Sequence, residues 1–385
     1  MKPIDFKRNG AGKLVKAPQG YWAFVPHPPP PPLKLTWNLV RENSEADRAL
    51  SELAGVARTL PNPHLLIHPF IRREAVLSSR IEGTQASLSD LLFFEASGER
   101  DVYSVDVIEV SNYVKALEYG VERLETLPVS LRLIREIHKQ LMEGVRGEHM
   151  TPGEFRRSQN WIGPPGCTLM EATFVPPPEA KMKEALDQFE KYLHASAQLP
   201  PLIRLAMLHY QFEAIHPFLV GNGRVGRLLL TLLLCADGLL PKPLLYLSAY
   251  FERHRQRYYD LLLAISQRGA WSEWITFFLR GVAEQSHDAI RRSNRLIDLW
   301  QEYRQKLQSA RTSPLSLRLV NELLSYPAIS VAWAAKRLKV THRSIQLNIE
   351  KLVRHGILRE ATGRRRNRIF VAPEIINILE AHKID

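Results

Sequence analysis

The sequence predicts a mainly α-helical protein with one small β-hairpin and a separate C-terminal domain of winged-helix type. Apolar residues recur at helical spacing through most of the first 310 residues. The stretch Thr151–Pro178 interrupts this pattern with three glycines and six prolines. After Arg311–Pro314 the pattern changes to short helices followed by two β-prone runs, Ile357–Leu358 and Ile369–Val371. We therefore expect an all-α body with one hairpin and a compact domain after it.

Length and composition indicate a multidomain globular protein. The 385 residues exceed what one hydrophobic core usually supports, so two or three domains are expected. With 45% hydrophobic and 24% charged residues the chain is folded rather than disordered. A formal net charge of +12 favours a polyanionic partner, such as nucleic acid, nucleotide phosphates or acidic protein. A basic solvated surface is the alternative.

Cysteine usage and apolar segments bear on the compartment. Cys167 and Cys235 form neither a disulfide framework nor a metal-type spacing, which fits a reducing cytosol, so we expect a cytoplasmic protein. Met1–Lys13 is charged and has no apolar core of a signal peptide. The most apolar run, Leu228–Leu240, is too short to cross a bilayer and contains Asp237, so it predicts a buried helix.

The first 150 residues predict a proline arm and several helices. Pro26–Pro32 is almost all proline and predicts a stiff polyproline II segment. We interpret it as an arm on the protein's own surface, with a ligand for a proline-reading domain as the alternative. The predicted helices begin near Glu42 and continue over Ile71–Phe94 (two short helices broken at Gly83), Val105–Leu124, and Ser130–Gly144, with Ser130 as cap and Gly144 as end.

The second half of the body predicts a loop with a short hairpin and then more helices. The β-prone residues Thr173–Val175 lie near the end of the Gly- and Pro-rich loop. The helices predicted after it are Glu179–His194, Pro201–Ala214, Gly223–Ala236, Ala249–Ile265, Trp271–Val282 and His287–Leu307.

The most informative run covers residues 216–227 and reads His-Pro-Phe-Leu-Val-Gly-Asn-Gly-Arg-Val-Gly-Arg. Gly221–Gly223 permits a turn with positive φ. A strongly helical run follows, so backbone N–H groups and the helix dipole converge on one spot that suits a phosphate. Arg224 and Arg227 are three residues apart and share a helix face. Two cations at a helix N-terminus are unfavourable unless an anion compensates them.

A histidine and a phenylalanine stand just before this turn. His216 is placed to accept a proton from an incoming hydroxyl, since imidazole titrates near neutral pH. Phe218 is expected to point into the core and fix the loop. A single Gly-x-Gly or a single histidine is usually structural, but the combination over twelve residues favours a phosphate site with a general base.

The run resembles the motif of the Fic/Doc family, His-x-Phe-x-(Asp/Glu)-Gly-Asn-Gly-Arg-x-x-Arg. The resemblance implies a Fic-type helical core that transfers AMP from ATP to a Ser, Thr or Tyr hydroxyl of a target protein, with His216 as the general base. It implies an ATP site formed by Gly221, Asn222, Gly223, Arg224, Val225, Gly226 and Arg227, with the two arginines on the outer phosphates.

One fixed position of the motif departs from the family pattern. Val220 stands where the family has Asp or Glu. By the resemblance, that carboxylate would be the protein's ligand for Mg²⁺ in such sites. Valine offers no oxygen to a hard cation, so no protein metal ligand is expected here. Mg²⁺ could still arrive on the phosphates. We therefore expect ATP binding to survive better than turnover, and a weak enzyme or a pseudoenzyme is an open alternative.

A second motif lies near residue 80. Ser78, Glu82 and Gly83 fit the pattern (Ser/Thr)-x-x-x-Glu-(Gly/Asn), which resembles the inhibitory helix of the family. Ser78 and Glu82 are four apart and share a helix face, and Gly83 is placed to end the helix. The resemblance implies that Glu82 pairs with Arg227 and keeps it from the γ-phosphate. An ordinary surface glutamate is the alternative.

Two further regions resemble parts of a Fic site. Gly153–Arg156 and Gln159–Gly163 resemble the stretch before the family's flap, and Thr173, Phe174 and Val175 resemble its return strand, whose open edge would recruit a target segment. Tyr259 is our choice for a nucleotide contact, because aromatic faces stack on adenine. Tyr258 or plain core packing is the alternative, and Trp271 and Trp274 are expected in the core.

The C-terminal region reads as a helix-turn-helix followed by a basic hairpin. Val331–Leu338 predicts one helix, and Thr341 is placed to cap a second that runs to His355. Contact with DNA phosphates is the functional interpretation, and protein contact is the alternative. The residues on the expected recognition helix are Arg343, Gln346 and Asn348, and those on the basic turn are Arg364, Arg365 and Arg366.

Together these observations predict four regions: an N-terminal arm and inhibitory helix (1–100), a Fic catalytic core (101–285), a connecting helix (286–312) and a winged-helix domain (313–385). The first hypothesis is a protein adenylyltransferase that Glu82 restrains. The second is a DNA-binding regulator whose degenerate Fic core senses nucleotide. We expect ATP as the ligand, a target protein and DNA as partners, no membrane, and a homodimer.

Overall fold

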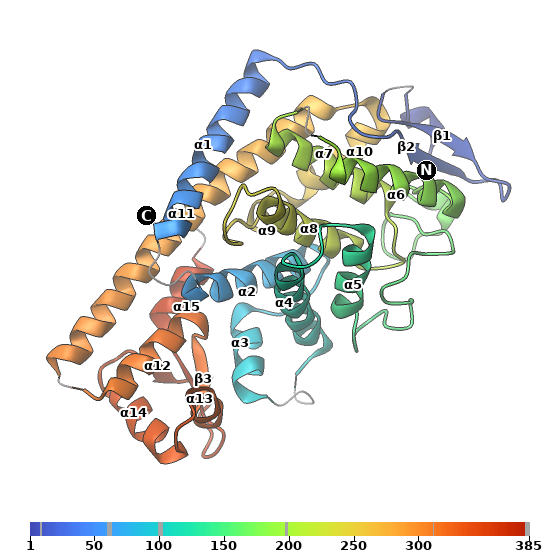
Figure 1. Cartoon of the computed structure of the whole chain (residues 1–385). Coiled ribbons are helices and arrows are strands. Elements are labelled where there is room, and N and C mark those ends of the chain that lie inside the picture. The colour runs from blue at the N-terminus through green and yellow to red at the C-terminus, as the bar shows by residue number, and fades with distance from the viewer. Residues whose placement is uncertain (8–9, 60–63, 99–102, 197–198, 311, 382–385) are drawn as a thin grey trace.

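The computed structural model describes residues 1–7, 10–59, 64–98, 103–196, 199–310 and 312–381, and helices dominate it (Figure 1). Arg311, part of the predicted boundary, lies outside these ranges. The helices of the body are α1 (Trp37–Thr59), α2 (His64–Ile81), α3 (Leu88–Ser97), α4 (Val105–Arg123), α5 (Leu131–Leu141), α6 (Glu179–His194), α7 (Pro201–Ile215), α8 (Asn222–Ala236), α9 (Ser248–Arg253), α10 (Arg255–Arg268) and α11 (Trp271–Ser309).

The caps explain where several helices begin and end. The predicted break at Gly83 is confirmed: α2 ends at Ile81, and Gly83 has φ +97°, which a residue with a side chain rarely adopts. Ser87 then forms a capping box with Asp90 and starts α3. Ser130 caps α5 through its side chain, as its position predicted.

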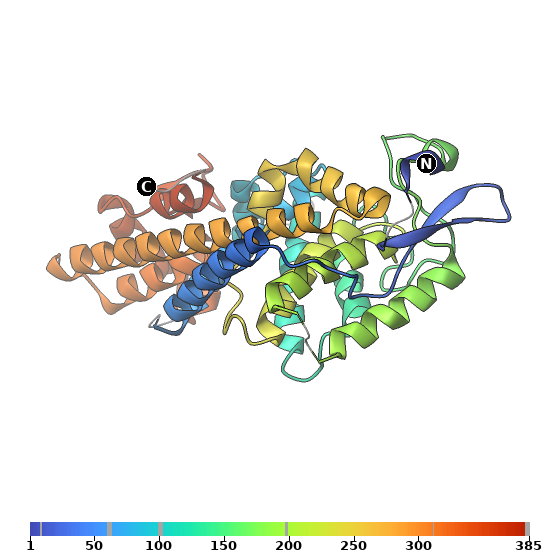
Figure 2. The same cartoon turned by 90° about the horizontal axis from the view of Figure 1, so that it is seen from above.

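The longest helix, α11, was predicted as two. Trp271–Val282 and His287–Leu307 form one unbroken helix, which runs along α1 and reaches from the body to the C-terminal unit (Figures 1 and 2). The residues between the two segments include neither Gly nor Pro, so nothing there breaks the helix. Gly281 lies inside α11, at a point where a Cβ would come within 2.7 Å of the Tyr250 ring. The absence of a side chain there allows α9 to pack closely against α11.

The predicted helix Ala249–Ile265 is two helices in the structure, α9 and α10, with His254 between them. His254 has φ −111° and ψ +33°, outside the helical region, so the chain changes direction there, although its amide still donates to the Tyr250 carbonyl and its carbonyl still accepts from the Tyr258 amide. The apolar spacing of the two helices did not reveal this change of direction.

An N-terminal hairpin was not predicted. Strands β1 (Gly12–Lys16) and β2 (Trp22–Pro26) pair antiparallel. The predicted polyproline II segment begins inside a strand, because Pro26 is the last residue of β2 and pairs with Gly12. The arm does lie on the protein, since the His27 carbonyl accepts a hydrogen bond from Gln211 Nε2 at 3.1 Å.

The predicted flap hairpin is reduced to a single β-bridge between Ile162 and Phe174. The residues between them form turns and the 3-10 helix η3 (Leu169–Glu171). A second 3-10 helix, η1 (Pro3–Asp5), lies at the N-terminus. The prolines in the stretch cannot donate ladder hydrogen bonds, which explains why no longer strand pair forms.

The core of the body is built around α7 and α8. Almost every residue of α7 is buried, and α8 buries its residues from Arg224 to Leu234 against α7, α4 and α5. The N-terminus of α8 is therefore held from several sides, and the loop between α7 and α8 lies on a rigid support.

The C-terminal unit is the winged helix that the sequence predicted. The two predicted helices are confirmed, and Thr341 caps the second through its side chain. A three-stranded antiparallel sheet has the order β3-β5-β4. The elements are α12 (Pro314–Ser325), β3 (Ala328–Ser330), α13 (Val331–Leu338), α14 (His342–Arg354), β4 (Arg359–Glu360), β5 (Ile369–Val371) and α15 (Pro373–Glu380).

This unit packs on the N-terminal helices of the body. Helix α12 contacts α2, strand β3 contacts α3, and α15 contacts both α11 and α2. Ser330 Oγ donates to the Ala96 carbonyl at 2.8 Å, and Tyr326 stacks on His68 with 5.5 Å between ring centroids. Within the described ranges, no helix is both long and apolar enough to cross a membrane.

Candidate active site

The loop between α7 and α8 makes two left-handed turns. His216 ends α7 with φ +49°, and Gly221 precedes α8 with φ +79°. The positive φ predicted for the glycines is found at Gly221, whereas Gly223 lies inside the helix. As a result, the chain reverses within a few residues and brings His216 beside the N-terminus of α8.

Asn222 closes this loop with its side chain. Its Oδ1 accepts from the Phe218 amide and its Nδ2 donates to the Phe218 carbonyl, both at 2.8 Å. The backbone amides of Asn222, Gly223 and Arg224 begin the helix, and none of them donates to a group in the described part of the chain. Three N–H groups at the positive end of a helix dipole are thus available to an anion.

His216 is arranged as a neutral base. Its Nδ1 lies 3.3 Å from the Glu213 carbonyl, which only accepts hydrogen bonds, so Nδ1 carries the proton and Nε2 keeps a free lone pair. Burial lowers the pKa of His216 to about 4. The imidazole is therefore uncharged at neutral pH.

Two side chains that sequence reasoning did not single out hold the backbone of this loop. Arg156 is buried, and its Nε donates to the His216 carbonyl at 2.9 Å. Asn160 Nδ2 donates to the Phe218 carbonyl at 2.7 Å. Both lie in the stretches noted before the flap, but nothing in their spacing indicates that they would reach this loop.

His138 of α5 is a third support, and no pattern in the sequence indicated it. Its ring stacks on Phe218, with 3.8 Å between centroids and 4° between planes. Its Nδ1 accepts from the Gly153 amide at 2.9 Å, so its Nε2 carries the proton and donates to the Val220 carbonyl at 3.1 Å. Burial lowers the pKa of His138 to about 4, which keeps this arrangement neutral.

Arg227 pairs with the two key residues of the second motif. Its Nη2 lies 2.7 Å from Glu82 Oε1, and its Nε donates to Ser78 Oγ at 2.9 Å. Burial opposes ionisation of Glu82, but the nearby Arg227 charge holds its pKa below the ordinary value. The ion pair that the resemblance implied is thus present, and Glu82 lies between the end of α2 and Gly83.

The Glu82 carboxylate lies directly over the start of α8. A Cβ placed on Gly223 would be 2.3 Å from Glu82 Oε1, so only glycine leaves room for the carboxylate there. Two buried arginine atoms nearby, Arg227 Nη1 and Arg224 Nε, have no hydrogen-bond acceptor among the described residues. The carboxylate therefore occupies space beside unpaired donors that would suit a larger anion.

The other predicted site residues differ in how far they are exposed to solvent. Val225 is in the core, and Gly226 faces Glu213, whose Oε1 would lie 2.3 Å from a Cβ at that position. Tyr259 is 38% exposed and its hydroxyl donates to the Ile81 carbonyl at 3.3 Å, whereas Tyr258 is buried and bonded to a histidine. Trp271 and Trp274 are buried, as predicted.

The loop offers no protein ligand set for Mg²⁺. The Val220 side chain lies against Gly147 and carries no oxygen. In the part of the chain that the structure describes, no three or more His, Cys, Asp or Glu side chains gather in a way that could hold a metal. The residues present do not fit a metal held by the protein.

The three flap residues are less open than predicted. Thr173 is exposed, but Phe174 and Val175 are buried. The Val175 carbonyl already accepts from the Phe24 amide of β2 at 2.9 Å. The N-terminal hairpin, which was not foreseen, therefore already uses the Val175 end of this stretch, while Thr173 stays exposed.

The residues predicted to contact DNA also differ in their exposure to solvent. Arg343 is exposed on α14, and Gln346 is partly buried, with its amide donating to Glu350 at 2.7 Å. Asn348 points inward and accepts from Ser316 at 2.7 Å, so it does not face a DNA groove. Residues 364–366 are exposed on the turn between β4 and β5.

Comparison with known proteins finds three family matches. Residues 40–122 match the Fic/DOC family N-terminal region, residues 128–234 match the Fic/DOC family, and residues 317–370 match an HTH DNA binding domain. A protein adenylyltransferase Fic of Aedes aegypti is 34% identical over 35% of this chain and 24% of its own length. One of Drosophila virilis is 31% identical over 38% of this chain and 27% of its own. The matched region thus spans about a quarter of these relatives.

Solved structures share the fold. A Fic family protein from Desulfovibrio desulfuricans G20 aligns over 89% of this chain and 98% of its own, with a TM-score of 0.56 and 17% identity. Fic-1 from C. elegans aligns over 68% of this chain and 74% of its own, with a TM-score of 0.51 and 22% identity. The histidine, the glycine turn and the arginines all lie within residues 128–234, so the chain is a Fic/DOC family protein that carries a C-terminal HTH domain.

Proposed function

We propose that this protein transfers AMP from ATP to a hydroxyl of a target protein and that Glu82 restrains the reaction. The observation that carries the proposal is the loop itself: His216 Nε2 has a free lone pair beside the three unpaired amides of residues 222–224. The relatives' name, protein adenylyltransferase, supports the same reaction class. A base and an anion site on one rigid loop are what hydroxyl attack on a phosphate requires.

The proposed step moves one proton and exchanges one P–O bond. The target hydroxyl oxygen attacks the α-phosphorus of ATP, and the bond to the bridging oxygen of the β-phosphate breaks. Pyrophosphate leaves, and AMP stays on the target through a new phosphoester bond. His216 Nε2 takes the hydroxyl proton as the oxygen attacks. The amides at the start of α8 stabilise the phosphate charge.

In the proposed restrained state Glu82 keeps the outer phosphates from their place. Its carboxylate uses Arg227 Nη2 and covers Gly223. Two anions in that space would repel each other at short range, so ATP must displace the carboxylate or bind askew. Removing the carboxylate frees Arg227 for the phosphates.

The test is labelling with ATP that carries radioactive phosphorus at the α-position. Glu82→Gly is expected to raise labelling of the protein or of added target protein by at least about tenfold, and His216→Ala in the same background is expected to abolish it. Glu122→Gly, an exposed glutamate in the last turn of α4, is the matched control and is expected to change nothing. If Glu82→Gly labels no more than the native chain while His216→Ala still lowers labelling, the restraint is wrong; no labelling in any variant rules out the transfer.

Turnover is proposed to be low even without Glu82. Val220 supplies no metal ligand, so Mg²⁺ would reach the site only on the phosphates of ATP and with water. Charge neutralisation then lacks an anchoring contact from the protein.

A second function is favoured by the C-terminal unit. We propose as the alternative that the chain is a DNA-binding regulator whose core senses nucleotide without transferring it. The match to an HTH DNA binding domain and the exposed arginines Arg343 and Arg364–Arg366 support it. In this proposal residues 313–385 act as a winged-helix domain, with α14 in the major groove and the basic turn on the phosphates.

The second function is tested by binding to duplex DNA over a range of salt concentrations. A plot of log affinity against log salt is expected to have a negative slope, and changing Arg364, Arg365 and Arg366 together to Gln is expected to reduce it by up to about 3. A control that changes Lys181 and Lys183 on α6 to Gln alters net charge elsewhere. An unchanged slope in the arginine variant contradicts the DNA interface.

A further inference from the structure

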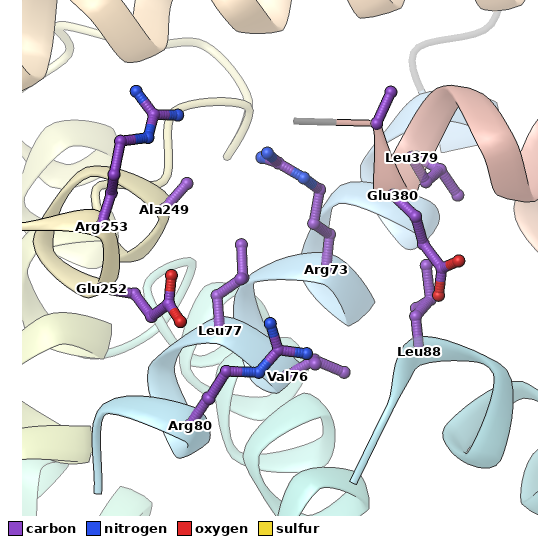
Figure 3. A pocket seen from close by; sticks show the side chains of 11 residues that line it. Arg73, Val76, Leu77, Arg80, Leu88, Ala249, Glu252, Arg253, Leu379 and Glu380 are labelled. Carbon is purple, nitrogen blue, oxygen red and sulfur yellow. The ribbon is translucent and has the colours of Figure 1, made fainter. Parts of the chain in front are cut away.

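A cavity of about 210 Å³ lies where the body meets the C-terminal unit, away from the loop of His216 (Figure 3). Its walls come from α2, α9, the start of α3 and the end of α15. The cavity is smaller than the roughly 300–1,000 Å³ of pockets for drug-sized ligands, so its occupant is small.

Two guanidinium groups on α2 face this cavity without adequate partners. Arg73 and Arg80 are seven residues apart and share a face of the helix. Arg73 makes no hydrogen bond within the described residues, and its one ion contact is with Asp288 at 3.6 Å. Arg80 has no carboxylate within 4 Å in the same part of the chain.

The carboxylate nearest Arg73 is already used. Both oxygens of Asp288 accept from Arg292, at 2.7 and 3.0 Å, and Arg292 also donates to the Ala381 carbonyl at 2.7 Å. Burial, and next the like charge of Arg292, lower the pKa of Arg73 to about 10, so it stays a cation at neutral pH. Arg73 is a mostly buried charge that one carboxylate, shared with another arginine, does not neutralise.

Two carboxylates line the same cavity and are also unpaired. Glu252 belongs to α9 and Glu380 to α15, and Figure 3 shows them on opposite walls with Arg80 between them. Neither makes an ion pair within 4 Å or a side-chain hydrogen bond in the described ranges. Partial burial raises the pKa of Glu380, and the charge of Arg80 offsets this rise only in part.

Apart from Arg253 of α9, which forms an ion pair with Glu284, the rest of the wall is apolar. Val76, Leu77, Leu88 and Leu379 supply most of it. The cavity thus combines separated positive and negative groups with an apolar surface. That combination matches a small molecule with an anion at one end, a cation at the other and an apolar body.

We propose that this cavity binds a free α-amino acid with an apolar side chain. The ligand's carboxylate would lie between Arg73 and Arg80, its ammonium group against Glu252 or Glu380, and its side chain on the leucines. Glu82 follows α2 directly, and α15 belongs to the C-terminal unit, so the ligand would contact both α2 and the C-terminal unit. The binding itself does not depend on the proposed transfer.

Calorimetric titration of the full chain tests the proposal. The probes are leucine, methionine and phenylalanine, together with leucinamide, which lacks the carboxylate, and N-acetyl-leucine, which lacks the ammonium charge. At least one free amino acid is expected to bind, and both leucine derivatives at least about tenfold more weakly than leucine, because each leaves one set of charges unpaired. Inorganic phosphate is titrated as the probe for a simple anion site.

Two variants locate the site. Arg80→Gln and Glu380→Gln are each expected to weaken binding about tenfold or more, and both remove exposed or partly exposed groups without a partner, so folding is retained. Arg41→Gln, 76% exposed on α1 and outside the cavity, is the matched control. The proposal is overturned if no amino acid binds up to about 10 mM, if N-acetyl-leucine or phosphate binds as well as leucine, or if neither variant weakens binding.

Discussion

At the scale of single residues, Gly223 shows how one missing side chain serves two states of the loop. The Gly223 amide is free to bind an anion. The absence of a Cβ at Gly223 also leaves room for the Glu82 carboxylate, whose Oε1 lies 2.3 Å from where that Cβ would be. Gly223→Ala is expected to lower the free energy of unfolding by about 1–2 kcal/mol, because the carboxylate must leave Arg227. In the Glu82→Gly background the same change is expected to cost less, because only Arg227 Nη1, 2.9 Å from that Cβ, still has to move, and alanine favours a helix by up to about 1 kcal/mol.

The matched control lies one turn away on α8. A Cβ at Gly226 would be 2.3 Å from Glu213 Oε1 and 3.1 Å from Phe212, not near Glu82. Gly226→Ala is therefore expected to destabilise both backgrounds equally in urea denaturation. An equal cost of Gly223→Ala in both backgrounds would show that the carboxylate does not lie over this glycine.

Val220 is the residue at which the site departs from its family motif. Its side chain is partly buried against Gly147 and offers no oxygen. In the Glu82→Gly background, Val220→Asp is expected to raise the initial rate of labelling about tenfold or more when Mg²⁺ is present, because a carboxylate is a preferred ligand of this cation. Labelling at several Mg²⁺ concentrations measures it.

Val220→Asn separates charge from shape. The amide has nearly the size of the carboxylate but only one weak oxygen ligand, so little gain in labelling is expected. Equal rates for the Asp and Asn variants would mean that the missing carboxylate is not what limits turnover.

At the scale of elements, local sequence signals predicted helices well and long-range pairing poorly. The helix Glu179–His194 and the helix Val331–Leu338 were predicted to the residue, because apolar spacing and caps are local. The hairpin of β1 and β2 was missed because its strands have five residues each and show no clear alternation.

The candidate site followed the same rule. His216, the glycine turn and the pairing partners Glu82 and Arg227 were predicted because whole motifs carry them. His138 and Arg156 were not, although both hold the loop. Their contacts are made by single side chains across the fold, and no spacing in the sequence encodes such contacts.

The hairpin makes a prediction about the flap. Phe24 of β2 is buried, its ring lies 5.8 Å from that of Phe174, and its amide donates to the Val175 carbonyl. Phe24→Ala is expected to cost about 3 kcal/mol locally and to loosen the bridge between Ile162 and Phe174. Hydrogen exchange of these two amides is expected to quicken about tenfold or more, because each donates across that bridge.

Phe94→Ala is the control for this prediction. Phe94 is partly buried on α3, against Tyr103 rather than against the flap. It is expected to leave exchange at Ile162 and Phe174 unchanged. Unchanged exchange in the Phe24 variant as well would mean that the hairpin does not stabilise the flap.

At the scale of the whole molecule, the site lies on a network of buried charges that joins distant helices. Arg227 of α8 reaches Glu82 beyond α2, and Arg224 of α8 lies 3.4 Å from Glu109 of α4. Glu109 also accepts from Arg146 at 2.8 Å. Such a network holds the N-terminal helices on the core, and removing one member leaves a buried charge unpaired.

Buried groups that hold unusual protonation states surround the same core. Burial lowers the pKa of His138 and His216 to about 4 and of His209 to about 3. Burial raises the pKa of Glu74 to about 7 and of Glu213 to about 8. At pH 6.5 the folded chain thus keeps three neutral imidazoles and two largely protonated carboxyls.

These groups give opposite pH dependences. The unfolded histidines bind protons below about pH 6.5 that the folded ones refuse, so their contribution to stability is lost as the pH falls. The folded carboxyls keep protons above about pH 4.5 that the unfolded ones release, so stability is lost as the pH rises toward 7 and 8. The free energy of unfolding is therefore expected to peak near pH 6.5 and to be about 1 kcal/mol lower at both pH 5 and pH 8.

Glu213→Gln tests whether the loss of stability above pH 6.5 comes from the protonated carboxyl of Glu213. Glu213 Oε1 is buried without a partner, so a neutral amide of the same size replaces the protonated carboxyl closely. The variant no longer takes up the extra proton, and urea denaturation at pH 5, 6.5 and 8 is expected to show stability that rises to pH 6.5 and then stays level. A native chain whose stability climbs steadily from pH 5 to 8 would mean that Glu74 and Glu213 are ionised in the fold, and a variant that keeps the decline above pH 6.5 would assign the decline to other groups.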